Sequence, residues 1–127
     1  VMGRGTYEKV LTFGDWPYQK PVIVLSSQAL NIPESLASRV EHSSETPQAI
    51  YKRLSEQRVK RIYLDGGITI QRFMAAGLLD DLTITSIPII LGKGKPLFAA
   101  LNRDIPLTLV SSRSYPFGFV QTTYVCS

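Results

Sequence analysis

The stretch RIYLDGGITIQRFMAAGLLDDLTITSIPIILGKG, residues 61–94, decides the fold. It opens with a short apolar run, residues 62–64, that is typical of a buried strand, and Gly66 and Gly67 follow almost at once. The residues after the glycines that are apolar at the spacing of one helix face are Ile70, Phe73, Met74 and Leu78. Where a strand enters a helix through glycines, the backbone can approach a ligand closely and the first helical N–H groups are open to an anion. The stretch therefore predicts a strand, a ligand-accessible turn and a helix.

The rest of the chain alternates predicted strands and helices. Val22–Leu25 is apolar at every position, which is expected of a strand covered on both faces of a parallel sheet. Thr46 and Pro47 supply an N-cap and a proline in the first helical position for a helix that ends near Gln57. Further elements are predicted at 6–11 (helix) and at 38–41, 61–64 and 82–90 (strands), with an antiparallel hairpin at 107–115 and 119–126. This pattern predicts an α/β fold with a mostly parallel central sheet flanked by helices, and places His42 in a solvated loop.

Composition limits the class of protein. The 127 residues are 44% hydrophobic and predict one domain, residues 1–127. The 14 basic and 10 acidic residues give +4, but the basic residues are scattered, which argues against nucleic acid as a partner. A single cysteine excludes a disulfide framework within the chain, and we expect no metal site. No apolar run approaches the roughly 20 residues of a membrane helix and no signal peptide is evident, so we expect a cytoplasmic protein that does not enter the membrane.

The glycine pair alone does not identify a ligand. The Rossmann pattern G-x-G-x-x-G is absent, and GKGKP at 92–96 is not a P-loop because proline follows its second lysine. A tight turn without a ligand is an equally good interpretation of the pair. Two other predicted strand ends carry similar groups, however, since MGRGTYE (2–8) has another glycine turn with a basic residue and VLSSQ (24–28) ends in hydroxyls. Ligands of open α/β sheets bind at the carboxyl ends of the strands.

These motifs, in this order and spacing, resemble the dihydrofolate-reductase fold. The resemblance covers nearly the whole chain and is closest to the branch that contains the C-terminal reductase domain of bacterial riboflavin biosynthesis proteins and small stand-alone relatives. Its most specific part is DGG, a helix ending in AGLLDD, and the strand leading to PIILGKGKPLF, residues 65–98. The acidic residue at Asp65, where dihydrofolate reductases usually carry another glycine, favours the riboflavin branch over folate reduction.

The resemblance implies NADPH as the hydride donor, and it assigns the cofactor-binding residues one stretch at a time. In the first turn, Gly3, Arg4 and Thr6 match residues that meet the cofactor phosphates, with Arg4 a candidate for the 2′-phosphate and Thr6 for the pyrophosphate. Leu25, Ser26 and Ser27 match the strand end beside the adenosine. Gly66, Gly67, Ile68 and Thr69 match the turn and helix start that hold the pyrophosphate. Thr85 matches a strand position that faces the substrate.

Several implications of the resemblance stay open at this stage. The first strand and first helix of the family, which carry much of the substrate pocket, have no counterpart here, so we expect them to lie outside this chain and no catalytic residue can be named. The expected activity is reduction of a pteridine- or pyrimidine-type small molecule, and the alternative is a non-catalytic NADP- or nucleotide-binding module of the same fold. The resemblance also implies a homodimer, which fits a hairpin with apolar groups on both faces, such as Tyr124 on one and Val125 on the other.

Overall fold

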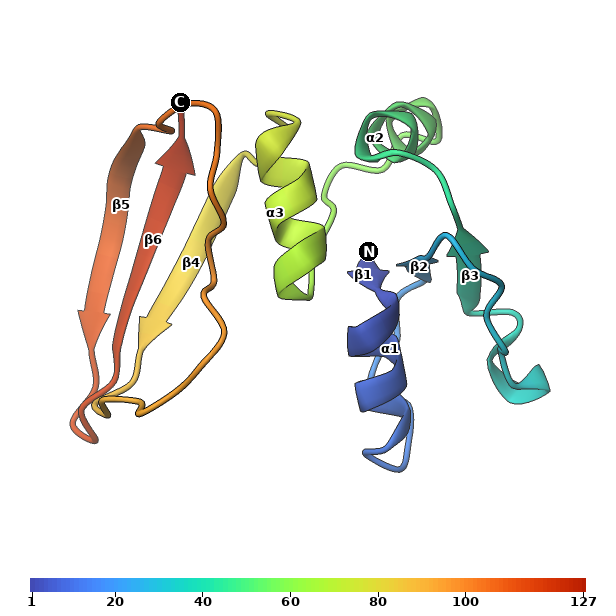
Figure 1. Ribbon diagram of the computed structural model, residues 1–127, viewed down its shortest axis with the longest axis horizontal. Helices are drawn as coiled ribbons and strands as arrows, with labels where there is room; N and C mark the ends of the chain where they lie inside the picture. The colour runs from blue at the N-terminus through green and yellow to red at the C-terminus, as the bar shows by residue number, and fades with distance from the viewer.

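The parallel strands and the C-terminal hairpin form two separate sheets. The computed structural model describes all residues 1–127 and is drawn in Figure 1. The first sheet has the strand order β1-β2-β3, with β1 at Met2–Gly3, β2 at Val22–Leu25 and β3 at Val40–Ser43, all parallel. The second has the order β4-β6-β5, with β4 at Asp81–Ser86, β5 at Leu107–Ser114 and β6 at Val120–Cys126, all pairs antiparallel. The predicted α/β class and the antiparallel hairpin are confirmed.

Three helices cover the parallel sheet and its neighbourhood. They are α1 at Arg4–Leu11, α2 at Pro47–Glu56 and α3 at Gly67–Ala75, and a 3-10 turn spans Glu34–Leu36. As the sequence predicts, the Thr46 hydroxyl caps α2 by accepting a hydrogen bond from the Ala49 backbone N–H at 3.1 Å. No helix of the protein is both long enough and apolar enough to span a bilayer.

Strand β2 is central to the packing because its two faces belong to two different core clusters. Val22 and Val24 pack on one side with Tyr7 of α1, and Ile23 and Leu25 pack on the other. The residues that complete the second cluster come from α2 and α3: Ile50, Leu54 and Phe73. All four β2 side chains are buried, as expected for a strand covered on both faces. Helix α1 therefore packs on one face of the parallel sheet, and helices α2 and α3 pack on the other.

Three predicted elements differ from the structure. Residues 61–64 do not form a strand, and a single parallel bridge, between Met2 and Asp65 just after them, joins this segment to β1. Strand β4 ends at Ser86 rather than near residue 90, since Pro88 has no N–H for a ladder hydrogen bond. The strand expected at 38–41 lies at 40–43.

That shift changes the surroundings of His42. The residue lies on β3, is half-buried, and its Nε2 is 2.9 Å from the Ser26 carbonyl oxygen. The expectation of a solvated loop histidine was therefore wrong. Hydrophobic periodicity could not place this residue on a strand. Strand β3 has only four residues, and its two buried side chains, Val40 and Ser43, do not alternate with exposed ones.

Candidate functional site

The carboxyl ends of neighbouring parallel segments meet at one edge of the sheet. Gly3 is in register with Leu25, and Leu25 is in register with Ser43. On the other side of β1, Met2 is bridged to Asp65, immediately before the glycine pair. The three sequence stretches predicted to bind the cofactor are thus brought together, although about 60 residues separate the first from the last.

The two glycine turns pack directly against each other. A Cβ atom at Gly3 would lie 2.8 Å from Oγ1 of Thr69, and a Cβ atom at Gly66 would lie 2.5 Å from Oγ1 of Thr6. Each threonine is the third residue of the helix that follows the opposite turn. Gly66 also has φ of +93°, a conformation that side-chain-bearing residues rarely adopt. Glycine is therefore required at both turns to let α1 and α3 start side by side, as Figure 1 shows around β1.

Both of these helices start with open N-termini. Gly3 is the N-cap of α1 and Gly66 the N-cap of α3, and neither helix has a side-chain cap or an acidic residue in its first turn. The first backbone N–H groups of a helix have no intrahelical acceptor, so an uncapped start leaves them available to an anion. Helix α2 provides the contrast, because Thr46 caps it. The two uncapped helices are the two that start at the glycine turns.

A tyrosine holds the carboxylate that precedes the second turn. The hydroxyl of Tyr18 donates a hydrogen bond to Oδ2 of Asp65 at 3.2 Å, and the ring of Tyr18 packs edge-on against Trp16 with centroids 5.2 Å apart. Burial first, and the negative charge of Asp65 second, raise the pKa of Tyr18, so the phenol stays protonated and remains a donor. Asp65 is thereby held by a partner on the α1–β2 connection, which restrains the start of the Gly66 turn.

The residues predicted beside the adenosine divide into structural and accessible ones. Leu25 is buried in the core and can offer only its backbone, whereas Ser27 is exposed. Ser26 is half-buried, and its Oγ accepts a hydrogen bond from the Gln28 backbone N–H at 3.2 Å. At the other turn, Ile68 is 77% exposed, which is unusual for isoleucine and leaves an apolar surface beside the open helix start.

Arg4, the first residue of α1, is held by two partners that sequence reasoning missed. Its Nε donates to Oε1 of Glu8 at 2.7 Å and its Nη1 donates to Oε1 of Gln28 at 2.6 Å. The first contact was readable as an i,i+4 ion pair on a helix. The second was not, because it joins residues 24 positions apart in the sequence.

Thr85 lies on the antiparallel sheet rather than with the glycine turns. It is exposed on β4, and its Oγ1 accepts a hydrogen bond from Nε2 of Gln121 on the neighbouring strand at 3.2 Å. The structure therefore brings ten of the predicted residues to one edge of the parallel sheet and leaves Thr85 on a second element.

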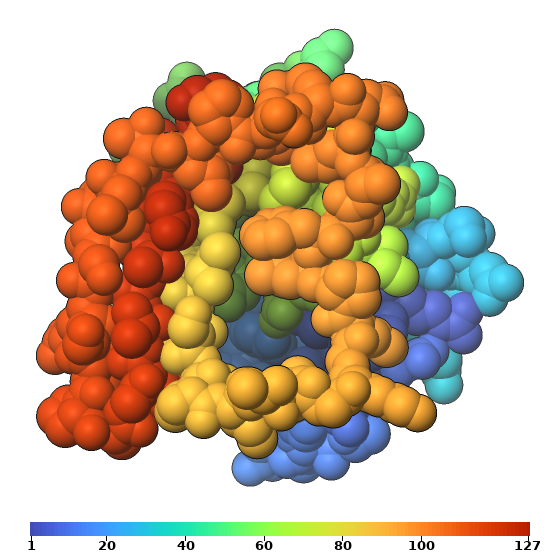
Figure 2. Space-filling view, turned by 60° about the vertical axis from the view of Figure 1, so that its left-hand side comes forward, coloured from blue at the N-terminus to red at the C-terminus, as the bar shows by residue number.

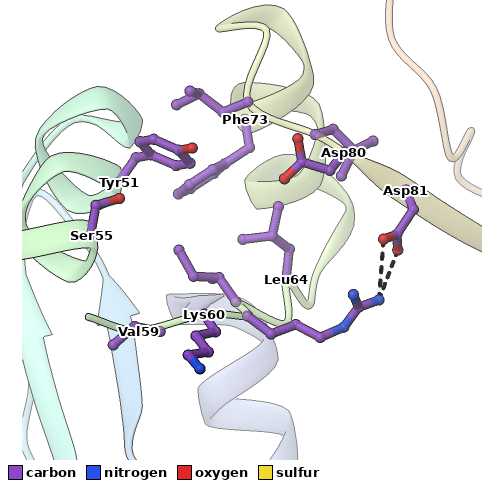
Figure 3. A pocket seen from close by; sticks show the side chains of 12 residues that line it. Tyr51, Ser55, Val59, Lys60, Leu64, Phe73, Asp80 and Asp81 are labelled. Carbon is purple, nitrogen blue, oxygen red and sulfur yellow. Dashed lines mark hydrogen bonds and ion pairs between the residues drawn. The ribbon is translucent and has the colours of Figure 1, made fainter. Parts of the chain in front are cut away.

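Two cavities lie elsewhere in the molecule. The first, of about 200 Å³, is lined by Leu64, Phe73 and Asp80, among others, and Figure 3 shows it open between the extended segment 61–64 and the start of β4. Arg61 and Asp81 also line this cavity, and Nη2 of Arg61 forms an ion pair with Oδ1 of Asp81 at 3.0 Å. The second, of about 760 Å³, lies beside the starts of β2 and β3. Neither is lined by Arg4, by Ser26 or by the glycines of the two turns.

Residues 14–120 match the family model of the RibD C-terminal domain, and the chain belongs to this family. It is 33% identical over 129 residues to the protein YwjB of Bacillus subtilis strain 168, a match that covers 98% of this chain and 71% of YwjB. A second B. subtilis protein, YyaP, is 37% identical over 73 residues, which is 57% of this chain and 39% of YyaP. The resemblance to the riboflavin branch is confirmed.

Solved structures agree with this family. A putative riboflavin biosynthesis protein from Shewanella sp. PV-4 superimposes with a TM-score of 0.93 at 37% identity, over 99% of this chain and 72% of that one. A diaminohydroxyphosphoribosylaminopyrimidine deaminase/5-amino-6-(5-phosphoribosylamino)uracil reductase from Thermotoga maritima has a TM-score of 0.71 at 16% identity, over 99% of this chain and 44% of that one. At that identity the second likeness supports the fold alone.

The two glycines of the second turn should respond differently to the same substitution. Gly66→Val should destabilise the fold by about 2–5 kcal/mol, since it combines a positive φ with a clash against Thr6. Gly67→Val should change the free energy of unfolding by less than about 1 kcal/mol, because nothing lies within 4 Å of a Cβ there. Urea denaturation of both variants measures this difference. Equal losses of stability would contradict the packing described for the two turns.

Proposed function

We propose that the chain binds NADPH with its pyrophosphate between the two glycine turns and serves as a reductase of a small heterocyclic substrate. The observation that carries the proposal is the pair of uncapped helix N-termini that start from adjacent parallel segments. A pyrophosphate has two anionic groups, and two helix starts offer two sets of backbone donors with favourable dipoles. Membership of the RibD C-terminal domain family supports a reductase-type role.

The residues present fit a dinucleotide. Nothing lies within 4 Å of where a Cβ atom would be at Gly5 and Gly67, so no side chain holds a phosphate away from the backbone there, and Thr6 and Thr69 place hydroxyls between the two turns. On the adenosine side, Arg4 is a planar fork of donors that suits a 2′-phosphate, and Ser27 offers an exposed hydroxyl. The remaining predicted residues lie around these groups. Leu25 packs in the core, Ser26 lies in the loop after β2, and Gly67 and Ile68 begin α3.

When bound, NADPH would supply the hydride. The chain would bind the cofactor phosphates at one edge of the parallel sheet and orient the nicotinamide from there. Figure 2 shows a hollow framed by β4 and the segment that follows it, with the N-terminal part of the chain at its floor. We place the substrate in this hollow and assign Thr85 of β4 as a substrate contact. A pyrimidine- or pteridine-type substrate is supported by membership of the RibD C-terminal domain family and by the 37% identity to the putative riboflavin biosynthesis protein of Shewanella sp. PV-4.

We also propose that the active form is a homodimer assembled through the C-terminal sheet. Leu107 and Leu109 of β5 are 42% and 56% exposed, and their partners in the strand register, Cys126 and Tyr124, lie on the same face. An apolar sheet face of this kind is expected to be covered in the working protein. A symmetric dimer covers the same patch on both copies with a single contact.

NADPH should bind the full chain about tenfold to one hundredfold more tightly than NADH. This ratio of affinities corresponds to the roughly 1.5–3 kcal/mol of binding free energy that charge-assisted hydrogen bonds between Arg4 and a 2′-phosphate would contribute. Arg4→Leu should bring the two affinities within about threefold, while Arg72→Leu, which removes an exposed arginine at the other end of α3, should leave the preference unchanged. A fluorescence titration of both nucleotides measures the dissociation constants.

Gly67→Val, which leaves the turn room to fold, should abolish binding of both nucleotides because its side chain covers the open N–H groups. Tight NADPH binding by a folded Gly67→Val protein would contradict the proposed pyrophosphate position. Equal affinities of the unmodified protein for NADPH and NADH would instead contradict the role of Arg4.

Sedimentation of the full chain at micromolar concentration should give the mass of a dimer, and Leu109→Glu should shift it to a monomer of unchanged thermal stability. The new charges would face each other across the proposed symmetric contact, while each is exposed in the single chain. Tyr51→Glu, a like change at a 43% exposed position on α2, is the control. A monomeric unmodified protein would exclude this dimer.

A further inference from the structure

A chain of hydrogen bonds runs from β3 across the 26–28 loop to α1. Nε2 of His42 is 2.9 Å from the carbonyl oxygen of Ser26, and a ring that carries a proton on Nε2 donates this bond. The Oγ of Ser26 accepts from the Gln28 backbone N–H at 3.2 Å. The Gln28 side chain then accepts from Arg4 at 2.6 Å, and Arg4 donates in turn to Glu8 at 2.7 Å. The loop and the arginine are therefore held by one connected set of contacts.

The last two contacts restrain a side chain that is otherwise free to move. The Arg4 side chain is 44% exposed and has no core packing that would fix its rotamer. A free arginine loses rotamer entropy when it is immobilised on a ligand. Glu8 and Gln28 each occupy one N–H of the guanidinium, which leaves three of its five donors for a ligand. The Arg4 side chain is therefore already ordered in the folded protein, and it loses less rotamer entropy when a ligand binds.

The chemical nature of the two partners differs in a way that matters for an anion. Glu8 carries a negative charge, so its pairing already compensates part of the arginine charge. Gln28 holds the guanidinium with a neutral amide oxygen, which orients Arg4 without adding a second negative charge. A carboxylate at position 28 would form a stronger pair with Arg4 and would repel a phosphate in the same place.

We propose that Gln28 is a positioning residue that directs Arg4 at the phosphate carried by the adenosine ribose and so sets the preference for the phosphorylated cofactor. This inference rests on the proposed NADPH function. It assigns the preference to an orienting contact as well as to the presence of arginine. Ser27 and Gln28 are both exposed, so the site has room for the phosphate beside the contact.

Three variants of the full chain test the proposal by their affinity for NADPH and NADH. Gln28→Glu should weaken NADPH binding at least tenfold and leave NADH binding within twofold, because only NADPH places a phosphate near position 28. Gln28→Leu, which removes the orienting contact without adding charge, should weaken NADPH binding about threefold to tenfold with the same selectivity. Gln57→Glu makes the same charge change at the exposed end of α2 and should leave both affinities unchanged.

The outcomes separate this inference from the proposed function. A protein whose unmodified form prefers NADPH, but whose preference survives Gln28→Glu and Gln28→Leu, overturns the role of Gln28 alone. Equal weakening of both nucleotides by Gln28→Leu overturns it as well, because a general disturbance of the loop would not distinguish them. If the unmodified protein binds neither nucleotide, the proposed function fails, and the inference fails with it.

Discussion

The candidate site depends on the mutual packing of two glycine turns against two threonines. Gly3 leaves room for Thr69, and Gly66 leaves room for Thr6, so that α1 and α3 can start from adjacent positions on the sheet edge. Methyl groups at these two glycines would push the helix starts apart. At the next glycines, Gly5 and Gly67, nothing lies within 4 Å of a Cβ position, so no side chain shields the backbone N–H groups of the two helix starts from the proposed anion.

The surrounding fold serves to hold that edge in place. Strand β2 has both faces buried. Because Leu25 pairs with Gly3, β2 also fixes where along the sheet edge the first turn lies. The second turn is held more lightly, by the bridge from Asp65 to Met2 and by the hydrogen bond from Tyr18 to Asp65. Helix α1 packs on one face of β2, and helices α2 and α3 pack on the other.

Local signals in the sequence predicted the parts of the fold that depend on neighbours in the chain. The buried strand Val22–Leu25, the Thr46 cap and the glycine turn before α3 were all readable from a few adjacent residues. Pro88 could also have marked the end of β4, had its missing N–H been weighed against the apolar run around it. These features are set by backbone conformation, which short stretches of sequence specify directly.

Features that depend on distant partners were not predictable in the same way. Residues 61–64 have strand character, but whether they pair depends on their contact with β1, a segment more than 50 positions earlier. The contacts of Arg4 with Gln28 and of His42 with Ser26 exist only because the sheet places those segments together. Thr85 has the residue type expected of a substrate contact, yet the sequence could not show that it lies on a separate sheet.

The most direct test of the central claim is to follow the backbone amide resonances of the full chain by NMR during titration with NADPH. The largest shifts should fall on the first-turn amides of both helices, those of Arg4, Gly5, Gly67 and Ile68, and they should saturate together, because one pyrophosphate contacts both helix starts. Shifts confined to one helix start, or centred on residues 37–41, which line the 760 Å³ cavity at the starts of β2 and β3, would contradict this claim.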